Sequence, residues 1–266
     1  MRRIDAHVHG FPDRLALAVR ERLNQRGGLR GGALLADVAA RVRGEGFDRA
    51  WILPYAHRPG VAESINEWSA AEVTNFPWLI AGATFHPGDE DLPRLVERAL
   101  VDLRLRVVKL HAAVGQFSPA DARLEPLWEA AGSLGVPVVT HAGQVSPGET
   151  APGEVDALVP VLRNHPRLRL VLAHTGQPAC DRALALMEDH PNLWGDLTPV
   201  WDRPASLAAE DLERFPGRFL FGSDAPNNPV PAGEQLRRIE GMGLPADVFA
   251  LIAGGTAERL MEPPRD

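Results

Sequence analysis

The chain has 266 residues, 45% of them hydrophobic and 24% charged, and carries a formal net charge of −7. This length suits one α/β barrel of about 250 residues or two small domains. The acidic balance argues against a nucleic acid or an anionic membrane as partner, because both require a basic face, and the single cysteine, Cys180, excludes an internal disulfide and fits a reducing compartment.

The start of the chain and its apolar runs carry no membrane signal. Met1-Arg2-Arg3 leads directly into a short strand, without the h-region of about 7–15 apolar residues that a signal peptide needs. No stretch approaches the roughly 18 apolar residues of a membrane span. We therefore expect a cytoplasmic protein that binds a small-molecule substrate, with neither nucleic acid nor membrane as partner; a homodimer stays open.

Eight apolar runs of strand length alternate along the chain with segments of helical periodicity. The predicted strands cover residues 3–8, 49–55, 78–85, 106–111, 136–141, 168–174, 192–197 and 218–223. The predicted helices, with apolar residues at three- and four-residue spacing, cover 34–44, 61–76, 92–103, 122–134, 155–164, 178–190, 207–215 and 233–241. Residues 11–32 form a longer excursion, which we expect to be a loop and a short helix over the barrel mouth.

This alternation predicts an α/β fold whose parallel sheet closes into a (β/α)8 TIM barrel, in one domain spanning residues 1–266. The alternative is an open doubly wound sheet, which would place a Gly-rich phosphate loop after its first strand. That position holds His7-Val8-His9-Gly10 instead. The barrel is the preferred fold, and its active site is expected at the C-terminal ends of the strands.

Two histidines stand at the end of the first predicted strand. His7 and His9 are two residues apart, so both side chains are expected to face the same way, and Asp5 is expected to share that face. Two imidazoles on one face can grip a metal ion at roughly 2.0–2.1 Å each. Such a pair also arises by chance, so it is weak evidence when taken alone.

Two further histidines end the fifth and sixth predicted strands. His141 is followed by Ala142-Gly143 and His174 by Thr175-Gly176, and these small residues leave room for a ligand above the barrel. A lone histidine at a strand end is most often a hydrogen-bonded structural residue. Two on adjacent strands favour a metal-binding or catalytic role.

Asp224 ends the eighth predicted strand, which lies beside the first strand in a closed barrel. Asp224 is therefore expected next to His7 and His9. A buried carboxylate needs a cation or hydrogen-bond donors, and a metal ion would serve. The alternative is a helix N-cap. We favour the metal ligand, because Gly222 permits a close approach at this strand end.

Six stretches distributed over nearly the whole chain carry a resemblance to a known family; they cover residues 4–9, 107–111, 137–143, 172–176, 221–224 and 254–260. With His-x-His on strand 1, histidines on strands 5 and 6 and an aspartate on strand 8, the chain resembles the amidohydrolase superfamily. More narrowly, it resembles amidohydrolase family 2, the relatives of aminocarboxymuconate-semialdehyde decarboxylase.

The resemblance implies one divalent metal ion, zinc in the first place and manganese as an alternative, held by His7, His9, His141 and Asp224. It makes His174 a general base or a ligand of a second metal. Such an ion lowers the pKa of a water to about 7 and polarises the scissile carbonyl. Asp224 would accept the proton of that water and later pass it to the leaving group.

Lys109 is the only lysine beside 27 arginines, which suggests a place where a guanidinium cannot serve. Lys109 and His111 are two residues apart and share a face. The lysine either stays an ammonium that binds a substrate carboxylate or is carboxylated and bridges two metals, as in the binuclear branch of the superfamily. We prefer the ammonium, with Lys109 and His111 as substrate-binding residues.

Three polar segments follow other predicted strands. His57 and Arg58 follow the second strand and His86 follows the third, so all three could contact the substrate or face water. Asp196, after the seventh strand, either orients a catalytic group or caps a helix. His57 and Arg58 are taken as candidate substrate-binding residues.

Three functions fit these residues. The first is a metal-dependent hydrolase that acts on an acyl C–N or C–O bond, in an amide or lactone, of a small anionic molecule. The second is a metal-dependent non-oxidative decarboxylase on the same scaffold. The third is a barrel that binds a metal or a metabolite without turnover, against which the complete ligand set argues.

Overall fold

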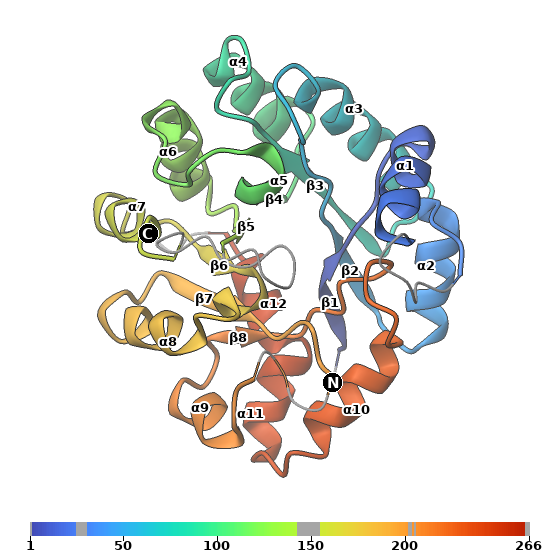
Figure 1. The fold of residues 1–266 in the computed structure, drawn as a ribbon, viewed down its shortest axis with the longest axis vertical. Coiled ribbons are helices and arrows are strands. Elements are labelled where there is room, and N and C mark those ends of the chain that lie inside the picture. The colour runs from blue at the N-terminus through green and yellow to red at the C-terminus, as the bar shows by residue number, and fades with distance from the viewer. Residues whose placement is uncertain (1, 25–30, 143–154, 202–203, 205, 264–266) are drawn as a thin grey trace.

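Eight parallel strands follow one another around a barrel in chain order, which confirms the predicted TIM barrel (Figure 1). The computed structural model describes residues 2–24, 31–142, 155–201, 204 and 206–263. The strands are β1 (Ile4–Val8), β2 (Arg49–Ile52), β3 (Leu79–Thr84), β4 (Val107–His111), β5 (Val138–His141), β6 (Leu170–Leu172), β7 (Leu193–Asp196) and β8 (Phe219–Leu220).

The seam between β8 and β1 is closed by backbone hydrogen bonds just beyond the end of β8. The Asp224 N–H donates to the His7 carbonyl at 2.8 Å, and the His9 N–H donates to the Ala225 carbonyl at 2.7 Å. Gly222 makes this approach possible, because a Cβ at that position would lie 2.6 Å from the Cβ of His7. The residues predicted to meet across this seam are therefore adjacent.

Helices surround the strands in Figure 1. They are α1 (Asp13–Asn24), α2 (Leu35–Gly44), α3 (Ala62–Val73), α4 (Leu92–Glu97), α5 (Ala112–Gly115), α6 (Glu125–Leu134), α7 (Leu158–Asn164), α8 (Cys180–Asp189), α9 (Ala209–Arg214), α10 (Ala232–Glu240), α11 (Ala246–Ala250) and α12 (Thr256–Leu260). Short π or 3-10 segments are η1 (Arg98–Asp102), η2 (Ala122–Leu124), η3 (Ala173–Gly176) and η4 (Leu251–Gly255). In the described ranges, no helix has the length and apolarity to cross a membrane.

The helices differ from the prediction at the two ends of the chain and directly after β4, where the short helix α5 was not predicted. The helix expected to be short within 11–32 runs for 12 residues as α1 and lies at the outer edge of the barrel in Figure 1. α11 and α12 were not predicted. Ala257 and Leu260 of α12 pack into the barrel interior, so this last helix contributes to the core.

Apolar side chains form two layers of core. The outer layer packs the strands against the surrounding helices, and the inner layer fills the barrel, as TIM barrels require. Inner side chains come from most of the strands: Ile4, Ala6, Trp51, Leu53, Ile80, Val107, Val139, Val171 and Leu220. The filled interior leaves the strand ends as the place for chemistry.

β1 contains a bulge between Asp5 and Val8. Asp5 pairs with Ala50 and Val8 pairs with Ile52, so three steps along β1 match two steps along β2. An extra residue in one strand shifts the alternation of its side chains by one position. The bulge therefore changes which residues of β1 face the interior.

The bulge overturns the expectation that Asp5 shares a face with His7 and His9. Ala50 belongs to the outer core, so Asp5, its neighbour in register, also points outward. Beyond the bulge the alternation of side chains along β1 is shifted by one residue, so His7 and His9 face the interior. Strict alternation, on which the sequence argument relied, does not hold across this segment.

Candidate metal centre

Six aromatic rings at the C-terminal end of the barrel contact one another in a closed circle. They belong to His7, His9, Tyr55, His111, His141 and His174, and the distances between neighbouring ring centroids run from 4.1 Å to 5.4 Å. These side chains come from β1, β4 and β5 and from the segments that follow β1, β2 and β6. We refer to this set as the aromatic circle.

The hydrogen bonds of His7 and His9 fix the tautomer of both rings. His9 Nδ1 lies 2.8 Å from the Leu53 carbonyl, which can only accept, and His7 Nδ1 lies 2.8 Å from Asp196 Oδ2. Both Nδ1 atoms therefore donate, so each ring in its neutral form carries its lone pair on Nε2. A ring held through Nδ1 in this way is typical of metal-binding histidines.

The two Nε2 atoms and one carboxylate oxygen converge on a common point. The Nε2 atoms of His7 and His9 lie 3.2 Å apart, and Asp224 Oδ1 lies 3.0 Å from His9 Nε2 and 3.8 Å from His7 Nε2. Two nitrogens bound tetrahedrally to one zinc ion at about 2.0–2.1 Å would be about 3.3 Å apart. The spacing of these lone pairs thus fits a shared divalent cation.

Electrostatics favour the protonation states that a metal site needs. Burial lowers the pKa of His7 well below its usual value, and the nearby Lys109 and His9 lower it further, so the ring is neutral. Burial opposes the ionisation of Asp224, but a proton on His9 Nε2, hydrogen-bonded to Asp224 Oδ1, lowers the pKa of that carboxyl to about 2. A cation bound at the same point would replace that proton and likewise leave Asp224 ionised. A neutral imidazole and a carboxylate are the ligand forms.

Asp196 joins two of the candidate residues. Its Oδ2 accepts from His7 Nδ1, and its Oδ1 accepts from the His174 N–H at 2.9 Å. Burial raises the pKa of Asp196, an effect that the charges of His174 and Lys109 oppose. Of the two roles predicted for Asp196, the structure shows the orientation of a neighbouring group.

His141 lies on the opposite side of the aromatic circle from His9. Its ring stacks on His111 with centroids 4.1 Å apart and an interplanar angle of 8°. Its Nδ1 is buried and has no hydrogen-bond partner among the described residues. Burial lowers the pKa of both rings well below the usual value. The neutral ring of His141 thus has a free nitrogen.

Within the part of the chain that the structure describes, two groups of side chains have donor atoms all within 4.8 Å of one another. One contains His7, His9 and Asp224, and the other contains His7, His174 and Asp196. His141 is in neither group. The predicted fourth ligand is therefore near the centre, in the aromatic circle, but farther away than the other three.

Three of the seven non-glycine residues with a positive φ in the described part of the chain lie at this site. His174, Thr175 and Asp224 have φ values of 56°, 46° and 59°. Non-glycine residues rarely adopt this region, and such strain is found mainly at functional sites. His174 Nδ1 also lies 3.1 Å from the Thr198 carbonyl, to which it donates, so its Nε2 is left free to accept a proton.

Lys109 is fully buried beside the convergent nitrogens. Its Nζ lies 3.4 Å from His7 Nε2, and no carboxylate oxygen of the described residues lies within 4.0 Å of it. Burial lowers its pKa to about 8, although the charges of Asp196 and Asp224 partly oppose this. The amine thus lacks a close carboxylate partner.

The other predicted substrate contacts differ in their surroundings. His57 and Arg58 are exposed in the loop after β2. His86 is buried, donates from Nε2 to the Gly115 carbonyl at 2.9 Å and accepts from the Gly88 N–H at 2.9 Å. Both of its nitrogens are used in holding loops together, so His86 is a structural residue.

Tyr55 was missed by the sequence argument. It closes the aromatic circle between His9 and His111, with centroid distances of 5.4 Å and 4.9 Å. Burial raises the pKa of its phenol, which therefore stays a hydrogen-bond donor. Tyr55 lies three residues beyond β2 and belongs to no motif, so only its position along the chain could have indicated it.

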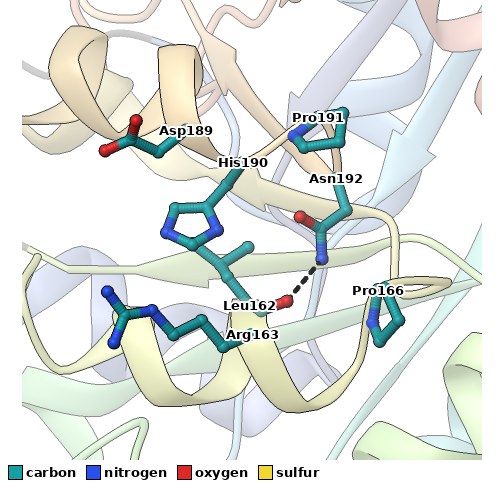
Figure 2. Close-up of a pocket in the computed structure, with 7 residues that line it drawn as sticks. All are labelled: Leu162, Arg163, Pro166, Asp189, His190, Pro191 and Asn192. Carbon is teal, nitrogen blue, oxygen red and sulfur yellow. Dashed lines mark hydrogen bonds between the residues drawn. The ribbon is translucent and has the colours of Figure 1, made fainter.

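A cavity of about 550 Å³, whose lining is drawn in Figure 2, lies before the N-terminal ends of β6 and β7, at the opposite end of the barrel from the histidines. It lies between the turns that follow α7 and α8, and its lining includes Arg163, Asp189 and His190. Asn192 donates to the carbonyls of Leu162 and His165, at 3.0 Å and 2.9 Å, and thereby ties the two turns together. This end of a TIM barrel normally serves stability.

Comparisons with known proteins find relatives of this chain by sequence. A family model described as amidohydrolase matches residues 4–261. A dihydroorotase from Halorhodospira halophila is 31% identical over 189 residues, which cover 64% of this chain and 53% of that protein. The chain thus spans about half the length of this curated relative.

Solved structures show the same fold. An uncharacterised TIM-barrel protein from Bordetella bronchiseptica has a TM-score of 0.77 at 19% identity, covering 98% of both chains. A 5-carboxyvanillate decarboxylase from Novosphingobium aromaticivorans, in complex with manganese and a nitrobenzoic acid, has a TM-score of 0.73 at 14% identity, covering 98% of this chain and 96% of that one. A probable 2-pyrone-4,6-dicarboxylic acid hydrolase from Acinetobacter baumannii, with citric acid bound, has a TM-score of 0.67 at 16% identity, covering 98% and 99%.

Proposed function

Because the chain belongs to the amidohydrolase family, a family of enzymes, we propose that it is a metal-dependent hydrolase of an amide or lactone bond in a small anionic substrate. The observation that carries the proposal is the convergence of His7 Nε2, His9 Nε2 and Asp224 Oδ1 beside a buried amine. The groups that would activate a water and the amine that would bind an anion thus lie next to each other.

The proposed ligands are His7, His9 and Asp224, with His141 as the fourth. The free Nδ1 of His141 supports this role, because a buried ring nitrogen without a partner is costly unless something binds it. Zinc is the first candidate and manganese the second. A bound divalent ion would supply a water of lowered pKa and would polarise the substrate carbonyl.

Proton transfer falls to two residues of the chain. Asp224 is ionised and lies at the convergent point, so its carboxylate can accept the proton of the attacking water and return it to the leaving nitrogen or oxygen. His174 Nε2 is free, because Nδ1 of the same ring donates to Thr198. His174 is therefore a second general base or, in a binuclear site, a ligand.

Lys109 is proposed to bind a carboxylate of the substrate as an ammonium. Its lack of a carboxylate partner within 4.0 Å supports this, because a buried cation is stabilised by an anion that arrives with the substrate. A carboxylated Lys109 in a binuclear site is the less favoured alternative. His111, His57 and Arg58 are further candidates for substrate contact.

A non-oxidative decarboxylase is the second candidate. The structural neighbour from Novosphingobium aromaticivorans is a decarboxylase in complex with manganese and an aromatic acid. In such a reaction Lys109 would hold a substrate oxygen, and His174 or Asp224 would deliver the proton that replaces the carboxyl group. The same side chains serve both reactions.

The deciding experiment is a substrate screen with metal analysis. Purified protein loaded with zinc or manganese is offered lactones, amides and aromatic carboxylic acids, while ring opening, amine release and carbon dioxide release are followed. Hydrolysis that stops on chelation and returns with the metal supports the proposal. Carbon dioxide release without hydrolysis would replace it with the decarboxylase, and full activity of the metal-free protein would refute both.

A further inference from the structure

Asp5 is a buried carboxylate next to the candidate metal centre that plays no part in the proposed chemistry. It is fully inaccessible to solvent, and the bulge of β1 turns it away from the interior. It cannot be a fourth ligand, because its register neighbour Ala50 lies in the outer core. Its side chain nevertheless lies between the ends of β1 and β8, which carry the proposed ligands.

One oxygen of Asp5 binds the backbone of both ligand-bearing strand ends. Oδ1 accepts from the N–H of His7 at 3.2 Å and from the N–H of Ser223 at 3.0 Å. The first belongs to a proposed ligand, and the second belongs to the residue directly before Asp224. The carboxylate thus spans the seam between β1 and β8.

Ser223 is held in place from its other side as well. Its carbonyl accepts from Gln235 Nε2 at 2.9 Å, and its Oγ accepts from the Ala225 N–H at 3.1 Å. The segment that carries Asp224 is thus held by α10 through Gln235, and backbone hydrogen bonds of Asp224 to His7 and of His9 to Ala225 join it to β1. Asp5 adds a side-chain bridge across the same seam.

We propose that Asp5 is a positioning residue: by bridging the His7 and Ser223 backbones it holds the bulge of β1 and the distance between the ligands, and so sets metal affinity without touching the ion. This role differs from that of Asp196, which orients the His7 ring by binding Nδ1. It rests on the metal centre of the proposed function but not on the identity of the reaction.

A single acceptor oxygen is sufficient for this role. The second oxygen, Asp5 Oδ2, is buried and has no hydrogen-bond partner among the described residues. Asparagine offers the same Oδ1 at the same place, whereas alanine offers none. The pair Asp5→Asn and Asp5→Ala therefore separates the bridging bonds from the charge of the side chain.

The test measures metal affinity without substrate, by competition of zinc or cobalt with a chromophoric chelator. Asp5→Ala should bind the metal about 10–100-fold more weakly, as expected for an outer-shell partner, and Asp5→Asn should stay close to wild type. The cobalt absorption spectrum should change in Asp5→Ala, because it reports coordination geometry. Leu212→Ala, a buried change on α9, is the control that lowers stability without weakening metal binding.

Equal affinities of wild type and a folded Asp5→Ala would overturn the inference while leaving the proposed hydrolase intact. Equally weak binding by Asp5→Asn and Asp5→Ala would also overturn it, because charge would then matter and bridging would not. If Asp5→Ala does not fold, Asp5→Ser, whose hydroxyl is too short to bridge both N–H groups, replaces it with the same expected loss. A wild type that binds metal but hydrolyses nothing would refute the proposed function alone.

Discussion

Histidines lie at both ends of this barrel, and their surroundings differ. At the mouth, the Nδ1 atoms of His7 and His9 are anchored while their Nε2 atoms face each other at 3.2 Å. At the opposite end, His165 Nε2 lies 3.2 Å from Glu125, and the His190 carbonyl accepts from Arg218. The first arrangement leaves lone pairs for a ligand; the second connects parts of the protein. The end of the strand at which a histidine lies thus matters more for its surroundings than its residue type.

The largest contrast is expected between two aspartates. Asp224→Asn at the mouth removes the carboxylate that accepts the proton, so kcat should fall by about 10²–10⁴-fold. Asp189→Asn at the opposite cavity should leave kcat unchanged. Steady-state kinetics on metal-loaded protein, with circular dichroism to verify folding, measures both. A similar loss of kcat in both variants would contradict the assignment of catalysis to the mouth of the barrel alone.

The next effect concerns the orientation of His7. Asp196→Asn weakens the acceptor that holds His7 Nδ1, and the metal affinity should fall by about 10–100-fold. Glu125→Gln changes the acceptor of His165 at the other end of the barrel and should leave the metal affinity unchanged. Chelator competition gives both constants. An unchanged affinity in Asp196→Asn would mean that packing alone orients the His7 ring.

A third variant examines anion binding at the mouth. Lys109→Met keeps the length and apolar stem but removes the charge, so KM for an anionic substrate should rise by about 10–100-fold, the equivalent of a lost charged hydrogen bond of about 1.5–3 kcal/mol. A neutral analogue of the same substrate should be affected much less. An equal rise for both would assign Lys109 to the metal site instead.

At the opposite end, the expected effect is on stability. Asn192→Ala removes two hydrogen bonds and leaves the Leu162 and His165 carbonyls without that donor, which should cost about 1–3 kcal/mol of unfolding free energy. Urea unfolding measures this cost. The kcat of the variant should equal that of wild type at 25 °C, and a reduced kcat would show that the two ends are coupled.

The smallest effect concerns Cys180, which begins α8 on the mouth side but belongs to the outer core. Burial raises the pKa of its thiol to about 11, so about one thiol in a thousand is ionised at pH 8. Iodoacetamide should label the native protein slowly and the unfolded protein quickly. Fast labelling of Cys180 in the native protein at pH 8 would show that the thiol is reactive despite its burial.

The sequence predicted the barrel because its signals are local and repeated. Apolar runs such as Val107–His111 and Val138–His141 appear as strands, and the strand-end residues His7, His9 and Asp224 meet as closure requires. Their proximity follows from topology alone. The roles of these residues in metal binding and catalysis stay predictions.

Other features needed coordinates. The bulge that turns Asp5 outward shifts the side-chain period by one residue, and no local pattern marks that shift. Tyr55 contacts the rings of His9, directly after β1, and His111 of β4, both far away in sequence. The helix α12 was missed because Gly254 and Gly255, which are typical of a helix end, stand directly before it. In the structure, the π-helical segment η4 continues through both glycines into α12. The bulge and the place of Tyr55 depend on contacts between distant segments, whereas α12 was hidden by the glycines directly before it.

Tyr55 gives the protein a built-in probe. It is the only tyrosine in the chain, and its ring contacts His9 and His111 at the mouth. Labelling the backbone nitrogen of tyrosine would therefore yield a single, self-assigned NMR signal from the aromatic circle. That resonance would register the arrival of an ion or a substrate directly, independently of turnover.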